Sequence, residues 1–141
     1  MTFIKGHCLC KSIQFKINSE YRKSVFCHCT MCQRSNSEFS LYTKVNLKNF
    51  IIIKKNSLKW YSSSKYYKRG FCSKCGSSLF FSKQAKPSHI AVITGCLNVS
   101  VPAVGHIYYQ DKKNKLTIGK NLKKFKKSSK GYFDNMLQKI K

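Results

Sequence analysis

Seven of the eight cysteines in this chain fall into three tight clusters, and this arrangement constrains the fold and the chemistry more than any other feature. The clusters are Cys8 and Cys10, then Cys27, Cys29 and Cys32, and finally Cys72 and Cys75. Protein sites for zinc are built from such short cysteine hooks and are usually four-coordinate. The count therefore predicts two zinc ions, one held by four thiolates and one held by three with an open position.

A disulfide framework is the competing explanation for so many cysteines. Disulfides persist in oxidising compartments, which a chain reaches by export. The first residues, Met1 to His7, contain no apolar segment that resembles a signal peptide. We therefore expect reduced thiols, metal ligation and a cytoplasmic location.

The charge of the chain is extreme for its length of 141 residues, which suits a single domain. Twenty-eight Lys and Arg residues oppose four acids, giving a formal net charge of +24. Such a charge attracts nucleic acid and other polyanions. However, nucleic-acid readers favour Arg, and nearly all of these basic residues are Lys, so a compositional bias explains the charge equally well. No apolar run approaches the length of a membrane span.

Short segments rich in β-branched and aromatic residues predict an all-β fold. Residues 12–17 alternate polar and apolar side chains, as a half-buried strand does. Further strands are predicted at 39–45, 50–53, 58–61, 66–71, 78–81, 90–94 and 106–109. Helix is predicted only as one turn at 30–35 and in the tail, where Phe133, Met136, Leu137 and Ile140 repeat at helical spacing. The lysine-rich segment 120–130 is interpreted as a solvated linker.

The last cysteine pair has the form of a zinc knuckle. Gly76 follows Cys75 and lets backbone amides turn toward the sulfurs. A thioredoxin-like redox pair would be followed by a helix, whereas residues 76–81 predict a turn into a strand. A knuckle supplies two ligands, and Cys8 with Cys10 are the natural partners that complete the set.

The middle cluster offers three thiolates within six residues. Three protein ligands and one exchangeable position are typical of catalytic zinc, which can hold a substrate thiol as thiolate. His28 is the alternative fourth ligand and would close the site. In an extended segment, however, its side chain points away from Cys27 and Cys29. The spacings of a classical zinc finger and of a nucleotide deaminase are absent from the sequence.

Together these clusters and their settings resemble the glutathione-dependent formaldehyde-activating enzyme family, which also includes centromere protein V. The matching segments are residues 6–10, residues 27–34, and residues 61–63 leading to residues 69–79. Weaker similarities are Gly95 to Leu97, His106 with Ile107, and residues 122–125. Lys11 and Asn98 depart from the family pattern, since Gly and an acid are usual at these positions.

The resemblance implies an Mss4-like fold, or β-tent, in a domain spanning residues 1–126. The tail over 127–141, which composition and periodicity predict to be basic and helical, lies outside it. It assigns a structural zinc to Cys8, Cys10, Cys72 and Cys75. It assigns a second zinc, thought to be catalytic, to Cys27, Cys29 and Cys32. The implied activity joins formaldehyde to glutathione, a carbon–sulfur lyase reaction run in reverse. Arg34 or Lys44 is then the expected partner of a glutathione carboxylate.

Several residues receive plainer interpretations. Cys96 is expected to be a small buried hydrophobe, His106 a hydrogen-bonded strand residue, and His89 the entrance of a strand. Trp60, Tyr61, Tyr66 and Tyr67 are expected to pack between strands, although they could also stack on bases. Two hypotheses follow: a zinc-dependent enzyme acting on a small thiol and an aldehyde, or a non-enzymatic zinc module that binds a polyanion.

Overall fold

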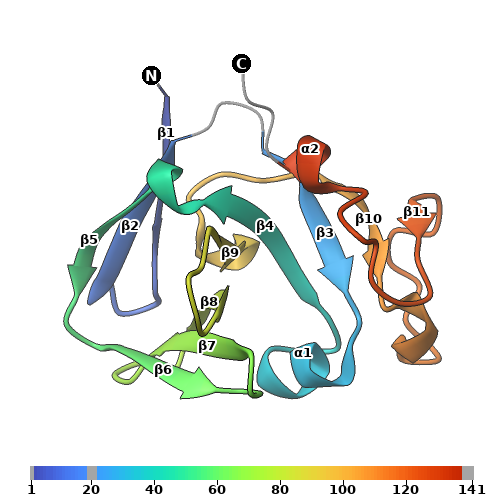
Figure 1. The fold of residues 1–141 in the computed structure, drawn as a ribbon, viewed down its shortest axis with the longest axis horizontal. Coiled ribbons are helices and arrows are strands. Elements are labelled where there is room, and N and C mark those ends of the chain that lie inside the picture. Colours follow the sequence, from blue (N-terminus) through green and yellow to red (C-terminus); the bar gives the residue numbers. More distant parts are fainter. Residues whose placement is uncertain (1, 19–21, 138–141) are drawn as a thin grey trace.

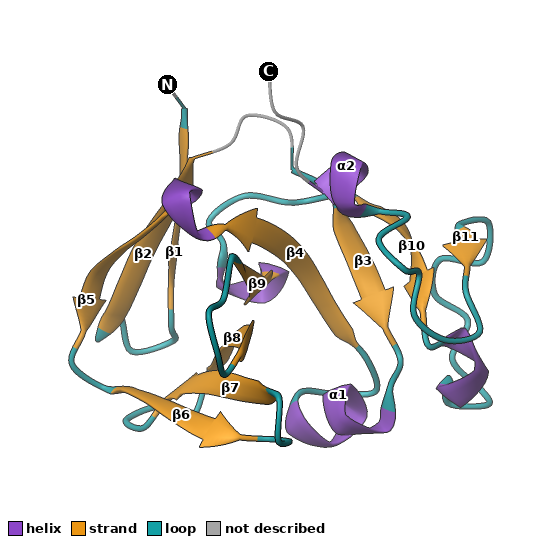
Figure 2. Ribbon diagram, in the orientation of Figure 1, coloured by secondary structure: helices purple, strands orange, loops and turns teal. Residues whose placement is uncertain are grey.

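The computed structural model describes residues 2–18 and 22–137 and is built almost entirely of β-strands (Figures 1 and 2). The strands are β1 Phe3–His7, β2 Ile13–Asn18, β3 Ser24–Cys27, β4 Ser40–Asn46, β5 Phe50–Lys55, β6 Leu58–Ser62, β7 Tyr67–Cys72, β8 Ser78–Lys83, β9 His89–Ile93, β10 Ala103–Ile107 and β11 Lys123–Lys124. The helices are α1 Thr30–Ser35 and α2 Asp134–Leu137, with 3-10 turns at Leu47–Asn49, Thr94–Cys96 and Tyr109–Asp111. The predicted all-β class is confirmed.

The strands form two sheets. The smaller has the order β1-β2-β5, and the larger has the order β11-β10-β3-β4-β9-β8-β7-β6. Most pairs are antiparallel, but β10 runs parallel to both β3 and β11. In Figure 1, β1, β2 and β5 lie on the left, the β6–β7 end of the larger sheet lies below them, and α1 lies near the β6–β7 hairpin.

Two hydrophobic clusters fill the interior. The first joins both sheets through Ile13, Phe15, Ile17, Val45 and Val92, all essentially inaccessible to solvent. Alternate residues of β2 are buried, as the sequence pattern predicts. The second cluster combines Val25, Cys27, Cys32 and Ile107 with two tail residues, Phe133 and Leu137. The middle cysteine cluster therefore belongs to a packed core, to which the tail contributes.

The structure corrects the prediction for the lysine-rich segment. Lys123–Lys124 forms strand β11 beside β10, so residues 120–130 are not simply a solvated linker. The helical tail is confirmed for Asp134–Leu137, where Leu137 is buried, whereas Ile140 lies outside the described residues. Among the described residues, no helix is long and apolar enough to cross a membrane.

Candidate metal centres

The outer cysteine pairs converge on one point, although 62 residues separate Cys10 from Cys72 along the chain. The Sγ atoms of Cys8, Cys10, Cys72 and Cys75 all lie within 4.8 Å of one another. Cys10 Sγ lies 3.7 Å from Cys8 Sγ and 3.8 Å from Cys72 Sγ. A disulfide needs about 2.05 Å between sulfurs, whereas a tetrahedral ion with bonds of about 2.3 Å spaces them by about 3.8 Å. The spacing fits a tetrahedral thiolate site and excludes disulfides.

Two tight turns present these sulfurs. Lys11 takes a left-handed conformation, with φ of 64°, and its N–H bonds to the Cys8 carbonyl at 3.0 Å. Gly76 has φ of 78°, and its N–H bonds to the Cys72 carbonyl at 2.8 Å. The Cys75 N–H donates to Cys72 Sγ at 3.4 Å. Such donors stabilise thiolates, as the knuckle interpretation requires.

The middle cluster brings three sulfurs together at the start of α1. The Sγ atoms of Cys27, Cys29 and Cys32 lie within 4.8 Å of one another, and Cys27 Sγ is 3.4 Å from Cys32 Sγ. Cys29 caps α1 by accepting a hydrogen bond from the Cys32 N–H at 3.3 Å. Three clustered thiolates repel one another unless a cation neutralises them. This donor set suits a soft divalent ion such as zinc.

The protonation of the three thiols is uneven. Hydrogen bonds from Cys27 and Cys29 lower the pKa of Cys32, with smaller contributions from Ser40 and Arg69. The pKa of Cys27 is raised by its hydrogen bonds to Cys29 and Cys32 and by burial. The cluster therefore favours one thiolate, and a bound cation is needed to ionise all three.

His28 does not join this cluster, which confirms the prediction that its side chain points away. Its ring is inaccessible to solvent, and Nε2 lies 2.7 Å from Nδ1 of His106. His106 Nε2 in turn donates to the carbonyl of Gly119 at 2.8 Å. Burial and the neighbouring His106 lower the pKa of His28 to about 4, so the ring is neutral at pH 7. Among the described residues, the middle cluster therefore gathers three cysteine sulfurs that could hold a metal ion and no fourth candidate ligand.

Aromatic and basic side chains that sequence reasoning missed surround the middle cluster. Tyr42 and Tyr108 pack against the hydrophobic cluster that holds Cys27 and Cys32. Burial raises the pKa of both phenols, and the nearby thiols raise it further, so both stay protonated. Arg69 lies with its Nη2 atom 4.0 Å from Cys32 Sγ. The sequence gives one indication of Arg69, because the chain has only three Arg residues among its 28 basic residues.

Other predicted residues lie elsewhere. Lys44 pairs with Asp134 at 3.5 Å, and both line a cavity of about 290 Å³ that Tyr42 and Ile107 also line. Cys96 is half-buried, its thiol lies 3.4 Å from the Ser78 carbonyl, and burial raises its pKa to about 11. His89 begins β9, as predicted.

Comparison with known proteins agrees with this geometry. A family model described as glutathione-dependent formaldehyde-activating enzyme matches residues 3–111. An uncharacterized lyase of Schizosaccharomyces pombe is 35% identical over 77 residues, which are 55% of this chain and 56% of the relative. The match thus spans about half the length of that curated relative.

One solved structure supports the fold. The crystal structure of a Rhodobacter sphaeroides protein from a structural genomics programme aligns with a TM-score of 0.57 at 19% identity. The alignment covers 71% of this chain and 99% of that protein. At this identity the likeness concerns the fold alone.

Proposed function

Since the chain belongs to the glutathione-dependent formaldehyde-activating enzyme family, we propose that it is a zinc-dependent enzyme of the carbon–sulfur lyase type. Its substrates would be glutathione or another small thiol together with formaldehyde or a related aldehyde. The observation that carries the proposal is the three-cysteine cluster, whose sulfurs converge within 4.8 Å without a fourth protein ligand among the described residues. The four outer cysteines would hold a second, structural zinc.

In the proposed reaction the thiol sulfur bonds to the aldehyde carbon while the carbonyl oxygen gains the thiol's proton. Cys27, Cys29 and Cys32 would hold the ion, and zinc bound there supplies a site where a thiol ionises at neutral pH. Tyr42 and Tyr108 are protonated donors near this site and can hydrogen-bond the developing alkoxide. Buried Cys27 and Cys32 fix the ligand geometry from the core side.

The test is the rate of thiol–formaldehyde adduct formation above the uncatalysed rate, measured by NMR exchange spectroscopy. We expect zinc-loaded wild type to accelerate the exchange and Cys29→Ser to abolish the acceleration. Cys96→Ser is the matched control, because Cys96 lies in neither cluster. Equal acceleration by wild type and Cys29→Ser would refute the proposal.

A second candidate function, binding of single-stranded nucleic acid, is favoured by the β6–β7 hairpin. Tyr61 and Tyr66 are 65% and 66% exposed, so the expectation that they pack between strands is wrong for these two, whereas Trp60, 38% exposed, stacks on Phe80 of β8 with 6.2 Å between the ring centroids. Lys68 lies 4.5 Å from the Trp60 ring and Lys65 lies 5.6 Å from the Tyr66 ring. Exposed rings among cations are typical of surfaces that stack bases.

This candidate predicts affinity for an oligonucleotide that falls steeply with salt. Replacing Tyr66 with Ala should weaken binding by roughly 5-fold or more, because base stacking contributes about 1–3 kcal/mol per base. Fluorescence anisotropy with a labelled oligonucleotide measures both effects. An affinity that changes neither with salt nor with the Tyr66→Ala substitution would contradict this second candidate function.

A further inference from the structure

Three serine hydroxyls lie against the sulfurs of the four outer cysteines. The Oγ and Sγ atoms that meet are those of Ser12 and Cys10 at 3.0 Å, Ser57 and Cys72 at 3.1 Å, and Ser77 and Cys75 at 3.2 Å. A cysteine that holds a metal ion is a thiolate without a proton, so the hydroxyl must be the donor. Hydrogen bonds to a charged acceptor are stronger than those between neutral groups.

We propose that these hydroxyls make the outer thiolates unreactive toward aldehyde and so confine adduct formation to the middle cluster. A donor stabilises the charge on sulfur, and this stabilisation is lost as the sulfur's electron pair moves into a bond with carbon. In the suppressed side reaction an outer sulfur would bond to the aldehyde carbon, its bond to zinc would break, and the carbonyl oxygen would take a proton from water. The proposal rests on the structural zinc proposed above and deepens it, because it names the residues that protect that ion.

Ser77 is oriented by the first cysteine pair. Its Oγ atom accepts a hydrogen bond from the Leu9 N–H at 3.1 Å. The backbone therefore occupies a lone pair of the hydroxyl and leaves its proton for Cys75 Sγ. Because Leu9 lies between Cys8 and Cys10, this bond also joins the first pair to the knuckle.

Ser12 and Ser57 form a hydrogen-bonded pair beside Cys72. A hydroxyl has one proton, so one of the two serines donates to its partner while the partner donates to a sulfur. Ser12 Oγ also lies 3.4 Å from Cys72 Sγ and 3.7 Å from Cys8 Sγ, so both serines reach Cys72. Such a chain strengthens its terminal bond through mutual polarisation. The two serines therefore act as one donor, and either can replace the other.

Burial cannot give the same protection. Cys10 is exposed and Cys75 is half-buried, whereas Cys27 and Cys32 of the middle cluster are buried. Access alone would therefore direct a small electrophile to the outer thiolates first. Hydrogen bonding around the ligands has to reverse that order if the outer ion is to persist beside a reacting aldehyde.

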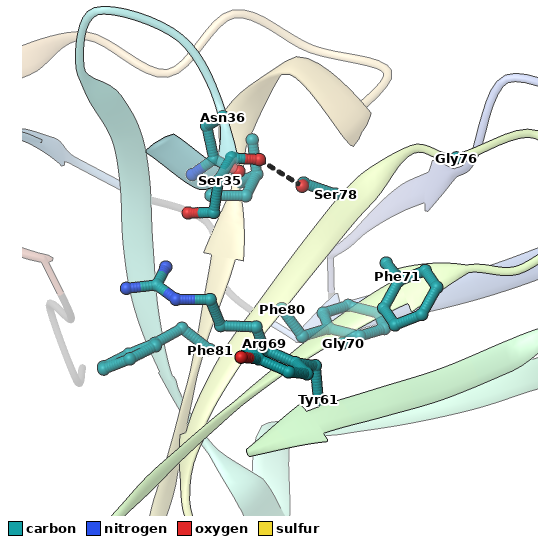
Figure 3. A pocket seen from close by; sticks show the side chains of 11 residues that line it. Ser35, Asn36, Tyr61, Arg69, Gly70, Phe71, Gly76, Ser78, Phe80 and Phe81 are labelled. Carbon is teal, nitrogen blue, oxygen red and sulfur yellow. Dashed lines mark hydrogen bonds between the residues drawn. The ribbon is translucent and has the colours of Figure 1, made fainter. Parts of the chain in front are cut away.

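One pocket borders both sites, so the same molecule can approach either. It has a volume of about 300 Å³ and is lined by Ser35 at the end of α1 and by Gly76 and Ser78 beside the knuckle. In Figure 3, Ser35 and Ser78 face each other, and Ser78 Oγ donates to the Ser35 carbonyl at 3.1 Å. An adjoining cavity of about 550 Å³ is lined by Met31 and Arg34 of α1. An aldehyde in this pocket is therefore close to the turns that carry both sets of sulfurs.

The middle cluster has fewer donors from outside. In the described part of the chain, Cys29 Sγ accepts from the Cys32 N–H at 3.3 Å. Cys32 Sγ has the Arg69 guanidinium at 4.0 Å and Ser40 beside it. The hydrogen bonds of Cys27 are with the other two sulfurs. A thiolate with fewer donors is the stronger nucleophile, so reaction is favoured at this cluster.

The test follows alkylation of each cysteine by iodoacetamide in the zinc-loaded protein, at fixed pH, by peptide mass spectrometry. In wild type, Cys29 should be modified before the exposed Cys10. The double variant Ser12→Ala with Ser57→Ala should speed modification of Cys10 about 10-fold, since a hydrogen bond to a charged group is lost. Each single variant should have a smaller effect, because the remaining serine still donates.

Matched variants separate the hydroxyl from the fold. Ser77→Ala should speed modification of Cys75 to a similar extent, whereas Ser77→Thr keeps the hydroxyl and should restore the wild-type rate. Ser88→Ala is the control, because Ser88 bonds to His89 instead of a cysteine. The rate at Cys96, which lies in neither cluster, reports any general loosening of the structure.

Rates at Cys10 and Cys75 that the alanine variants leave unchanged, or raise only together with the rate at Cys96, would overturn the proposal. The adduct assay described above keeps the two claims apart. If wild type accelerates adduct formation and the alanine variants are alkylated as wild type is, the enzyme proposal stands and the role of the serines fails. If no adduct formation is accelerated but the alanine variants are alkylated faster, the role of the serines stands and the enzyme proposal fails.

Discussion

The tail residue Phe133 packs on the backbone of β10, and a cycle of two substitutions tests this contact. Phe133 is 1% exposed, and its ring meets Phe125 edge-on at 5.4 Å. A Cβ atom added at Gly105 would overlap the Phe133 ring and lie 2.7 Å from the carbonyl oxygen of Lys123. Gly105 therefore leaves the space that the ring fills.

The magnitudes follow from these contacts. Phe133→Ala empties a buried site, which typically costs about 3–5 kcal/mol, and we expect the lower end because the short α2 can relax. Gly105→Ala overfills the same site and should cost about 1–3 kcal/mol. In the double variant the clash with the ring is gone, although the contact with Lys123 remains. The double variant should therefore lose about 1–2 kcal/mol less than the sum of the single losses.

Urea unfolding at saturating zinc measures the free energies of unfolding of wild type, the two single variants and the double variant. Tyr132→Ala is the control, because Tyr132 is 54% exposed and its loss should cost less than about 1 kcal/mol. Additivity within about 0.5 kcal/mol would refute the packing described here, since residues out of contact behave independently. Phe133→Ala should also weaken metal binding at the three-cysteine cluster, because Cys27 and Cys32 share its hydrophobic cluster.

Three further predictions concern the turns, the buried histidines and the outer cysteines. Lys11→Gly should raise the free energy of unfolding, measured by urea denaturation, by about 0.5–1 kcal/mol, because φ of 64° strains a side chain that glycine lacks. A lower free energy of unfolding would contradict this. His106→Ala should lower the free energy of unfolding by about 3 kcal/mol, because the ring is buried and hydrogen-bonds both His28 and Gly119. The control His89→Ala should lower it by less than about 1 kcal/mol. Burial lowers the pKa of both His28 and His106, so as pH falls below 6.5 these rings take up protons in the unfolded chain before they do in the folded one. Wild type should therefore lose stability more steeply than His106→Ala, and the difference between their free energies of unfolding should narrow from about pH 7.5 to about pH 5.5. A difference that widens instead would contradict this sign. EDTA should lower the melting temperature of wild type, and Cys72→Ser without EDTA should melt near this lowered temperature. A melting temperature that neither EDTA nor Cys72→Ser changes would argue against a structural metal.

The cysteine spacing predicted more of the site than of the fold around it. Short hooks require local turns, so the grouping of Cys72 with Cys75 and the turn at Gly76 followed from neighbouring residues. The strands with alternating burial, such as β2, were predictable for the same reason. Strand β1 was not predicted, and β11 consists of two Lys residues whose pairing with β10 depends on tertiary contacts.

The residues around the middle cluster were also not predictable from local sequence. Arg69 and Tyr42 reach it from strands far away in sequence, and only the sheet order brings them together. His28 illustrates the opposite case, because the alternation of an extended segment predicted its direction correctly. Its partner His106, 78 residues away, could not be identified by that argument.

Native mass spectrometry of gently purified protein, with and without glutathione, tests the open metal site most directly. We predict two zinc ions on each wild-type chain and a saturable glutathione adduct. Cys29→Ser should lose one zinc ion together with the adduct, whereas Cys96→Ser should keep both ions and the adduct. Two zinc ions without any glutathione adduct, or an adduct that survives in Cys29→Ser, would contradict an exchangeable position at Cys27, Cys29 and Cys32.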